Sequence, residues 1–178
     1  MGDWTRDTPW RQGHVLPIGA VTALGFCGSE LAATRLALII SHDCDLANSP
    51  DQEPDVEVIV GHQIAEVDGN FAHAKNPRRL HLEFRQCDTV IAGDFLATDK
   101  KLVPKTNLAD YQPRDDLDIA QQDHEILQRW LAARYRRAAF SDEFDRRLAS
   151  TGLKDRLAKV LASSGPYIRA VLFDVDGG

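Results

Sequence analysis

The hydrophobic period of the chain changes near residue 118, and this change constrains the fold more than any other feature of the sequence. Before that point, apolar residues form short runs or alternate with polar residues, which is typical of β-strands. In RRLHLEF, for example, Leu80, Leu82 and Phe84 fall on one face of an extended chain. We therefore expect residues 12–103 to form a small sheet or a partly closed barrel.

The expected strands are separated by segments rich in Pro, Gly, Asn and Asp, such as NSPDQEP, which turns select. Five stretches carry the strand pattern: GHVLPIGAVTALGF, RLALII, DVEVIV, RRLHLEF and DTVIAGDFLA. Residues 104–117, with two prolines among charged residues, are expected to form an exposed connection.

Three helices are expected within residues 118–164, because apolar residues there recur at helical spacing. The first carries Ile119, Ile126, Leu127, Trp130 and Leu131 and runs to about Ala139. Ser141 is the expected cap of the second helix, and Gly165 with Pro166 ends the third.

A last apolar run at residues 167–173 predicts a closing strand that rejoins the sheet. A sheet-rich half followed by helices is typical of the α+β class. The expectation is therefore a single α+β domain over residues 1–178.

Composition and charge exclude several classes of protein. With 43% hydrophobic and 27% charged residues, the chain matches ordinary globular domains. Three cysteines, Cys27, Cys44 and Cys87, without CxxC spacing favour free thiols and a cytoplasmic location. A net charge of −6 argues against nucleic acid as the main partner, and no apolar stretch has the length of a membrane span.

The stretch ISHDCDLAN places His42, Asp43, Cys44 and Asp45 directly after the expected strand RLALII. If the strand persists to residue 44, His42 and Cys44 share one face while Asp43 and Asp45 share the other. This quartet is the best candidate catalytic site: Cys44 attacks, a histidine acts as base, and Asp43 or Asp45 orients that base. The two acids would also tend to raise the pKa of the Cys44 thiol.

The same quartet supports two other interpretations. His42 and Cys44 are good zinc ligands, and His81 could complete a set, so zinc is the possible cofactor. The alternative without chemistry is a turn in which Asp43 or Asp45 accepts hydrogen bonds from backbone amides and Cys44 fills a small gap.

Two basic segments are candidate binding surfaces. Arg78 and Arg79 stand at a strand entrance, where paired guanidinium groups could hold an anionic substrate; the alternative is an exposed basic turn. Arg129, Arg136 and Arg137 lie on the polar side of the first expected helix. They could contact nucleic acid or an acidic partner, although such a helix face is commonly just solvated.

Two segments resemble known families. The motifs ISHDCDL, NPRRLHL and WLAARYRRAAFSDEF together resemble an uncharacterised family of bacterial and phage-associated proteins over residues 35–145. That resemblance implies a prokaryotic cytoplasmic protein, carried with mobile-element or defence genes, and implies no catalytic residue. AVLFDVDGG resembles the first motif of haloacid-dehalogenase-type phosphatases, with Asp174 and Asp176 at the positions of the nucleophile and the acid/base. Gly178 stands where that family usually has threonine, so we assign the segment no activity.

Two functional hypotheses follow. The first is a thiol- or metal-assisted hydrolase that acts on an anionic substrate held by Arg78 or Arg79. The second is a non-catalytic interaction or regulatory protein, of the phage–host defence or inhibitor type, that binds a partner protein. A pocket around Cys44 with a histidine in hydrogen-bond reach favours the first hypothesis, and an exposed apolar patch without such a pocket favours the second.

Overall fold

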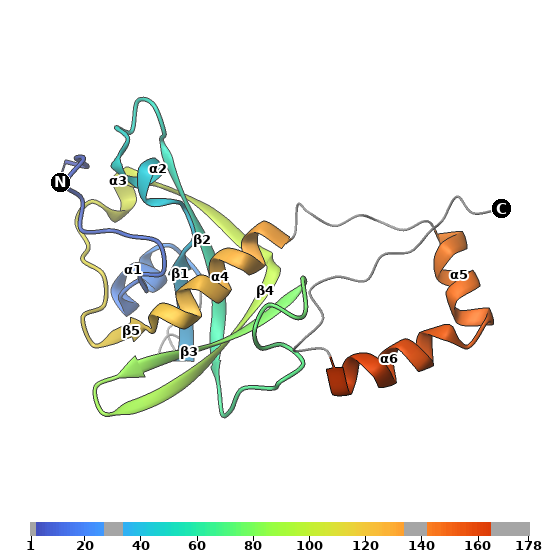
Figure 1. Cartoon of the computed structure of the whole chain (residues 1–178). Coiled ribbons are helices and arrows are strands. Elements are labelled where there is room, and N and C mark those ends of the chain that lie inside the picture. Colours follow the sequence, from blue (N-terminus) through green and yellow to red (C-terminus); the bar gives the residue numbers. More distant parts are fainter. Residues whose placement is uncertain (1–2, 27–33, 134–141, 165–178) are drawn as a thin grey trace. The chain divides into compact units, whose positions relative to one another are not determined.

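The computed structural model describes residues 3–26, 34–133 and 142–164 (Figure 1). The chain groups into two compact units, Met1–Arg136 and Arg137–Gly178. The second unit contains α5 (Asp142–Ser150) and α6 (Leu153–Ser164), which agree with the second and third expected helices. The expected single domain stays a prediction, and the expected closing strand at 167–173 lies outside the described residues.

The first unit is built on a curled antiparallel sheet that forms half a barrel (Figure 1). Its strands follow the order β1-β2-β4-β3-β5. Their bounds are β1 Arg35–Ile39, β2 Asp55–Ile64, β3 Arg79–Gln86, β4 Thr89–Pro104 and β5 Leu117–Ile119. The α+β class and the partly closed barrel expected from the sequence are thereby confirmed.

In the described part of this unit, four helices accompany the sheet: α1 Ile18–Ala23, α2 Asp43–Ala47, α3 Lys105–Leu108 and α4 Gln121–Ala133. The helix α4 crosses one face of the sheet (Figure 1) and buries Ile126, Leu127 and Trp130 against it. These three residues belong to the helical stripe predicted from the sequence.

Two hydrophobic clusters cover the two faces of the sheet. Leu36, Leu38 and Ile40 contribute to the cluster that contains α4, whereas Ala37 and Ile39 contribute to the cluster that contains Trp4 and Trp10. Because β1 is buried on both faces, its sequence is a continuous apolar run rather than an alternating one. Buried aromatic and aliphatic side chains on both sides hold this part of the fold together.

One predicted strand is wrong, and another strand ends before the quartet. The stretch expected as a strand at 13–26 contributes only a single bridge between Val15 and Leu38, and then forms α1. Pro17, which has no N–H to donate to a ladder, precedes this helix, and Ala20 and Val21 bury its inner side. The condition under which His42 and Cys44 would share a strand face is not met, because β1 ends at Ile39 and α2 begins at Asp43.

Two boundaries also differ from the prediction. The connection 104–117 contains the short helix α3. Ile119, which was expected in the first long helix, ends β5 instead, and α4 begins at Gln121.

Candidate functional site

The segment after β1 turns sharply because polar groups on neighbouring elements bind its backbone and side chains. The Ser41 hydroxyl accepts a hydrogen bond from the Glu57 amide at 2.8 Å, and the Asp43 carboxylate accepts one from the Gln12 amide at 2.8 Å. His42 is extended, with φ −71° and ψ 151°, and precedes the first turn of α2. Strand alternation therefore does not apply to the quartet.

The far end of α2 is held from the protein interior. The ammonium group of Lys105 donates to the carbonyl oxygens of Asp45 (2.6 Å) and Asn48 (2.8 Å), and the Trp4 indole donates to that of Leu46 (2.8 Å). Carbonyl groups at a helix end have no partner within the helix, so these donors satisfy them. The position of α2 thus depends on residues about 40 and 60 positions away in the chain.

The Cys44 thiol is exposed and lies close to two members of the predicted quartet. Its Sγ is 3.6 Å from His42 Nδ1 and 3.4 Å from Asp45 Oδ1. The hydrogen bond to Asp45 raises the pKa of the Cys44 thiol above its usual value, with a smaller contribution from desolvation. The structure therefore brings together the predicted nucleophile and base, but the nearest carboxylate disfavours the reactive thiolate.

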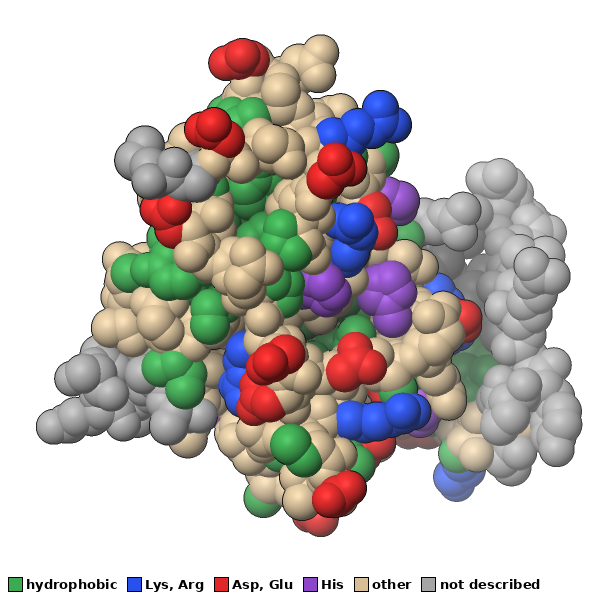
Figure 2. Space-filling model, turned by 90° about the vertical axis from the view of Figure 1, so that its left-hand side faces the viewer, with side chains coloured by type: hydrophobic (Ala, Val, Ile, Leu, Met, Phe, Trp, Pro, Cys, Tyr) green, Lys and Arg blue, Asp and Glu red, His purple; other side chains and the backbone are tan. Residues whose placement is uncertain are grey.

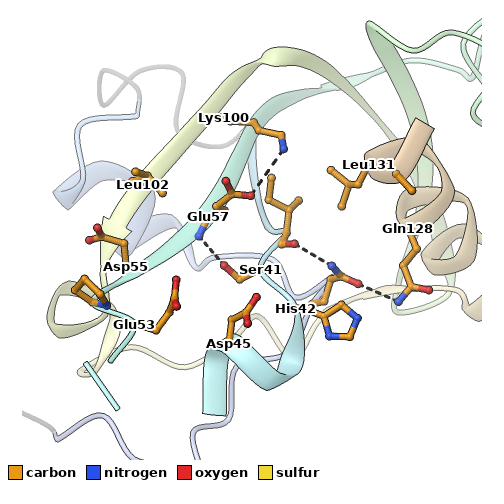
Figure 3. Close-up of a pocket in the computed structure, with 14 residues that line it drawn as sticks. Ser41, His42, Asp45, Glu53, Asp55, Glu57, Lys100, Leu102, Gln128 and Leu131 are labelled. Carbon is orange, nitrogen blue, oxygen red and sulfur yellow. Dashed lines mark hydrogen bonds and ion pairs between the residues drawn. The ribbon is translucent and has the colours of Figure 1, made fainter. Parts of the chain in front are cut away.

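A pocket of about 800 Å³ opens beside this segment, between α2, the ends of β2 and β4, and the last turns of α4 (Figure 3). Residues from all these elements line it: Gln12, Ile40, Ser41, His42, Asp45, Glu53, Pro54, Asp55, Glu57, Lys100, Leu102, Gln128, Leu131 and Ala132. His42 and Asp45 of the predicted site belong to this lining. Asp43 and Cys44 do not.

The lining of the pocket is acidic. Four carboxylates, those of Asp45, Glu53, Asp55 and Glu57, face one lysine and one histidine. That lysine, Lys100, is 3.8 Å from the Glu57 carboxylate, so part of its charge is already balanced. A group entering this pocket meets an excess of negative charge, which favours a cationic ligand.

The wall opposite the carboxylates is neutral and is fixed by a chain of amides (Figure 3). Gln128 on α4 donates to the Gln12 side chain at 3.0 Å, and Gln12 donates to the Ile40 carbonyl oxygen at 2.9 Å. Leu131 and Ala132 continue this wall. The pocket therefore offers carboxylates on one side and amide and aliphatic surface on the other.

The structure places the two predicted anion-binding arginines differently. Arg79 forms a bidentate ion pair with Asp94 of β4, at 2.8 Å and 2.7 Å, and its guanidinium group lies 4.6 Å from the centre of the Phe71 ring. Arg78 is exposed beside it. Both carboxylate oxygens of Asp94 already accept hydrogen bonds from the Arg79 guanidinium group. Arg79 therefore has its anionic partner within the protein.

Asp94 is the centre of a row of ionisable side chains that the sequence did not predict. It is only 2% exposed and is paired in register with His62 of β2 on one side and His81 of β3 on the other. Its carboxylate oxygens lie 3.6 Å from His62 Nε2 and 3.4 Å from His81 Nε2. This row depends on the order of three strands, which no local motif encodes.

His81 is therefore not brought to the other two predicted zinc ligands. Val58 of β2 pairs with Ile39, the last residue of β1, and His62 lies four residues further along β2. At a strand rise of about 3.3 Å per residue, this places His62 about 13 Å along the sheet from the end of β1. His42 lies beyond Ile39 in the opposite direction from that row. Within the described residues, no group of three or more His, Cys, Asp or Glu side chains is arranged to hold a metal ion.

The predicted basic helix is described only in part. Arg129 is exposed on α4, and Arg136 and Arg137 lie outside the described residues. On the face shown in Figure 2, Lys and Arg side chains are interspersed with Asp and Glu rather than gathered into one basic area. Among the residues that the structure describes, no helix combines the length and apolar character needed to cross a bilayer.

Comparisons with known proteins add no relative. No family model matches the chain, and no similar protein is found among curated proteins or solved structures. Function must therefore be inferred from the geometry of the pocket and the quartet.

Proposed function

We propose that this chain is a non-catalytic binding protein whose acidic pocket holds a basic segment of a partner protein. The observation that carries the proposal is the composition of the pocket: four carboxylates line it, and its one lysine lies within 4 Å of Glu57. A Lys or Arg side chain entering it would find carboxylates for its charged end and Leu131 and Ala132 for its aliphatic stem.

The proposal also agrees with the position of the thiol. Cys44, the only nucleophile of the predicted hydrolase, is outside the pocket lining. Its hydrogen bond to Asp45 also raises the pKa of the Cys44 thiol above the usual value. A hydrolase would need its nucleophile to face the bound substrate. A binding protein has no such requirement, and the pocket alone is sufficient for it. The expected phage–host or inhibitor role and the cytoplasmic location would fit such a protein.

A labelled lysine-rich peptide tests the proposal, with fluorescence anisotropy as the measurement. Replacing two pocket acids, Glu53→Gln with Asp55→Asn, should weaken binding by about tenfold, since each exposed charge pair contributes up to about 1 kcal/mol. The matched control, Asp51→Asn with Glu66→Gln, removes the same charge from exposed positions outside the pocket lining. If both double variants weaken binding equally, the peptide is attracted by net charge and the pocket has no special role.

A thiol hydrolase remains the second candidate, because one observation specifically favours it. The 3.6 Å contact between Cys44 Sγ and His42 Nδ1 is the arrangement a thiol nucleophile and its base require. The test is a screen of ester and thioester substrates with the parent protein and Cys44→Ser. Turnover by the parent protein that disappears in Cys44→Ser, at an unchanged melting temperature, would establish the hydrolase function. No turnover by the parent protein would exclude it.

A further inference from the structure

The turn formed by residues 68–72 is fastened to β3 through one histidine. The Asp68 amide donates to His81 Nδ1 at 3.0 Å, and the His81 amide donates to the Phe71 carbonyl oxygen at 3.0 Å. The Phe71 ring also packs on the His81 ring, with centroids 5.0 Å apart. His81 thus binds this turn through two hydrogen bonds and one ring contact.

The hydrogen bond from Asp68 defines the protonation state of His81. A nitrogen that accepts an N–H must carry a free electron pair, so Nδ1 is unprotonated. In neutral imidazole the proton then resides on Nε2, which faces Asp94 Oδ1 at 3.4 Å without hydrogen-bond geometry. The folded arrangement therefore requires neutral His81, which is only 6% exposed.

Several charged groups surround this ring. Asp94 of β4 and Asp68 of the turn favour the protonated imidazole, whereas Arg79 of β3 opposes it. His62 of β2 approaches the same Asp94 carboxylate from the other side. Burial is the largest influence, and together with Arg79 it outweighs the two carboxylates and lowers the pKa of His81 below its usual 6.5.

We propose that His81 is a pH-sensitive latch: protonation converts Nδ1 from an acceptor into a donor, which releases the 68–72 turn from β3 in acid. Two N–H groups cannot satisfy each other, so protonated His81 and the Asp68 amide repel. Because the folded pKa is lowered, the latch is closed at neutral pH and opens as the pH falls below 6.5 toward the folded value. Opening frees the Asp68 amide and uncovers the Nδ1 side of the buried His81 ring.

Amide hydrogen exchange of the full chain tests the latch directly. The protection factor of the Asp68 amide, corrected for intrinsic exchange, should fall by about fivefold or more between about pH 7.5 and about pH 5. Unchanged protection over this range would overturn the proposal. Nitrogen chemical shifts of His81 in the parent protein give a second measurement that needs no variant. They should show the proton on Nε2 at neutral pH, and a proton on Nδ1 there would also overturn it.

Two matched variants assign the effect to His81. In His81→Asn, the side-chain carbonyl occupies the position of Nδ1 and accepts the Asp68 amide without titrating, so the pH dependence should disappear. In His62→Asn, which removes the half-exposed histidine on the other side of Asp94, the pH dependence should persist. If the pH dependence is lost in His62→Asn and kept in His81→Asn, the latch is not His81.

Discussion

The ammonium group of Lys105 lies 2.6 Å from the carbonyl oxygen of Asp45, although sixty residues separate them in the chain. Lys105 is fully buried and also donates to Asn48, so a charged group inside the protein fixes the end of α2. A cation is favourable at a helix C-terminus, where carbonyl groups concentrate negative partial charge. This contact connects the buried Lys105 to the rim of the acidic pocket, because Asp45, which accepts the hydrogen bond, also lines the pocket.

Replacing this lysine by an apolar side chain of similar length should destabilise the protein. Lys105→Met leaves the carbonyl groups of Asp45 and Asn48 without this donor and removes a charged group from a fully buried position, so we expect the free energy of unfolding to fall by about 2 kcal/mol. Urea denaturation measures the change. Lys101→Met, at an exposed position on β4, is the control and should change stability by less than about 0.5 kcal/mol. Equal effects in the two variants would show that the buried contact contributes nothing specific.

Gly61 of β2 should not tolerate a side chain. It lies where the register between β2 and β4 shifts, and a Cβ added there would clash with the Asp94 carbonyl oxygen and lie 2.6 Å from the Phe95 ring. Gly61→Ala is expected to cost about 2 kcal/mol or more, because backbone must move to relieve the overlap. Gly69→Ala is the control, since nothing lies within 4 Å of its added Cβ. A thermal melt of each variant measures the cost, and an equal loss for Gly69→Ala would contradict the close approach as its cause.

Regular strands of this fold were predictable because their burial follows their sequence pattern. Leu80, Leu82 and Phe84 of β3 are all buried, as alternation predicted. The short helices were not predictable: α1 has only two buried residues and α2 only one, Leu46. Five or six residues give too little period to recognise, and α2 depends on distant donors instead.

The candidate site was predictable only where it is local in sequence. His42, Cys44 and Asp45 do lie together, because His42 directly precedes α2 and the other two residues belong to its first turn. The carboxylates of Glu53, Asp55 and Glu57 join Asp45 only through the pairing of β2 and the position of α2. Arg79 was predicted to hold an anionic substrate, and in the structure its guanidinium group pairs with Asp94, fifteen residues further along the chain. Strand register, which sets that pairing, is not visible in a single sequence.

The ion pair between Asp94 and Arg79 should contribute to the free energy of unfolding at neutral pH, and this contribution should be lost in strong acid. Burial disfavours ionisation of Asp94, yet its hydrogen bonds and charge contact with Arg79 lower its pKa below the usual 3.8. A carboxyl group with a lowered folded pKa stabilises the fold above pH 3.8, and this contribution disappears as the pH falls through the folded value. Asp94→Asn should therefore reduce stability at neutral pH by about 1–2 kcal/mol, since Arg79 is partly exposed, and by less below about pH 3.5.

Urea denaturation midpoints of the parent protein and of Asp94→Asn, at neutral and at acid pH, measure the contribution of the Asp94 charge to stability. Asp51→Asn, at an exposed carboxyl, should have no such pH-dependent effect. An equal loss for Asp94→Asn at both pH values would mean that packing, rather than the charge of Asp94, accounts for it.

The reactivity of Cys44 distinguishes a thiol held by a carboxylate from a thiol activated by a histidine. Because Asp45 raises the pKa of the Cys44 thiol, Asp45→Asn should increase its alkylation rate by iodoacetamide near pH 8 severalfold. Mass spectrometry of the modified peptides follows each site separately, and exposed Cys87 in the same molecule provides the internal reference. Its rate should not change. His42→Ala tests the opposite hypothesis. If the alkylation rate of Cys44 falls sharply in this variant, His42 activates the thiol, and the hydrolase becomes the better hypothesis.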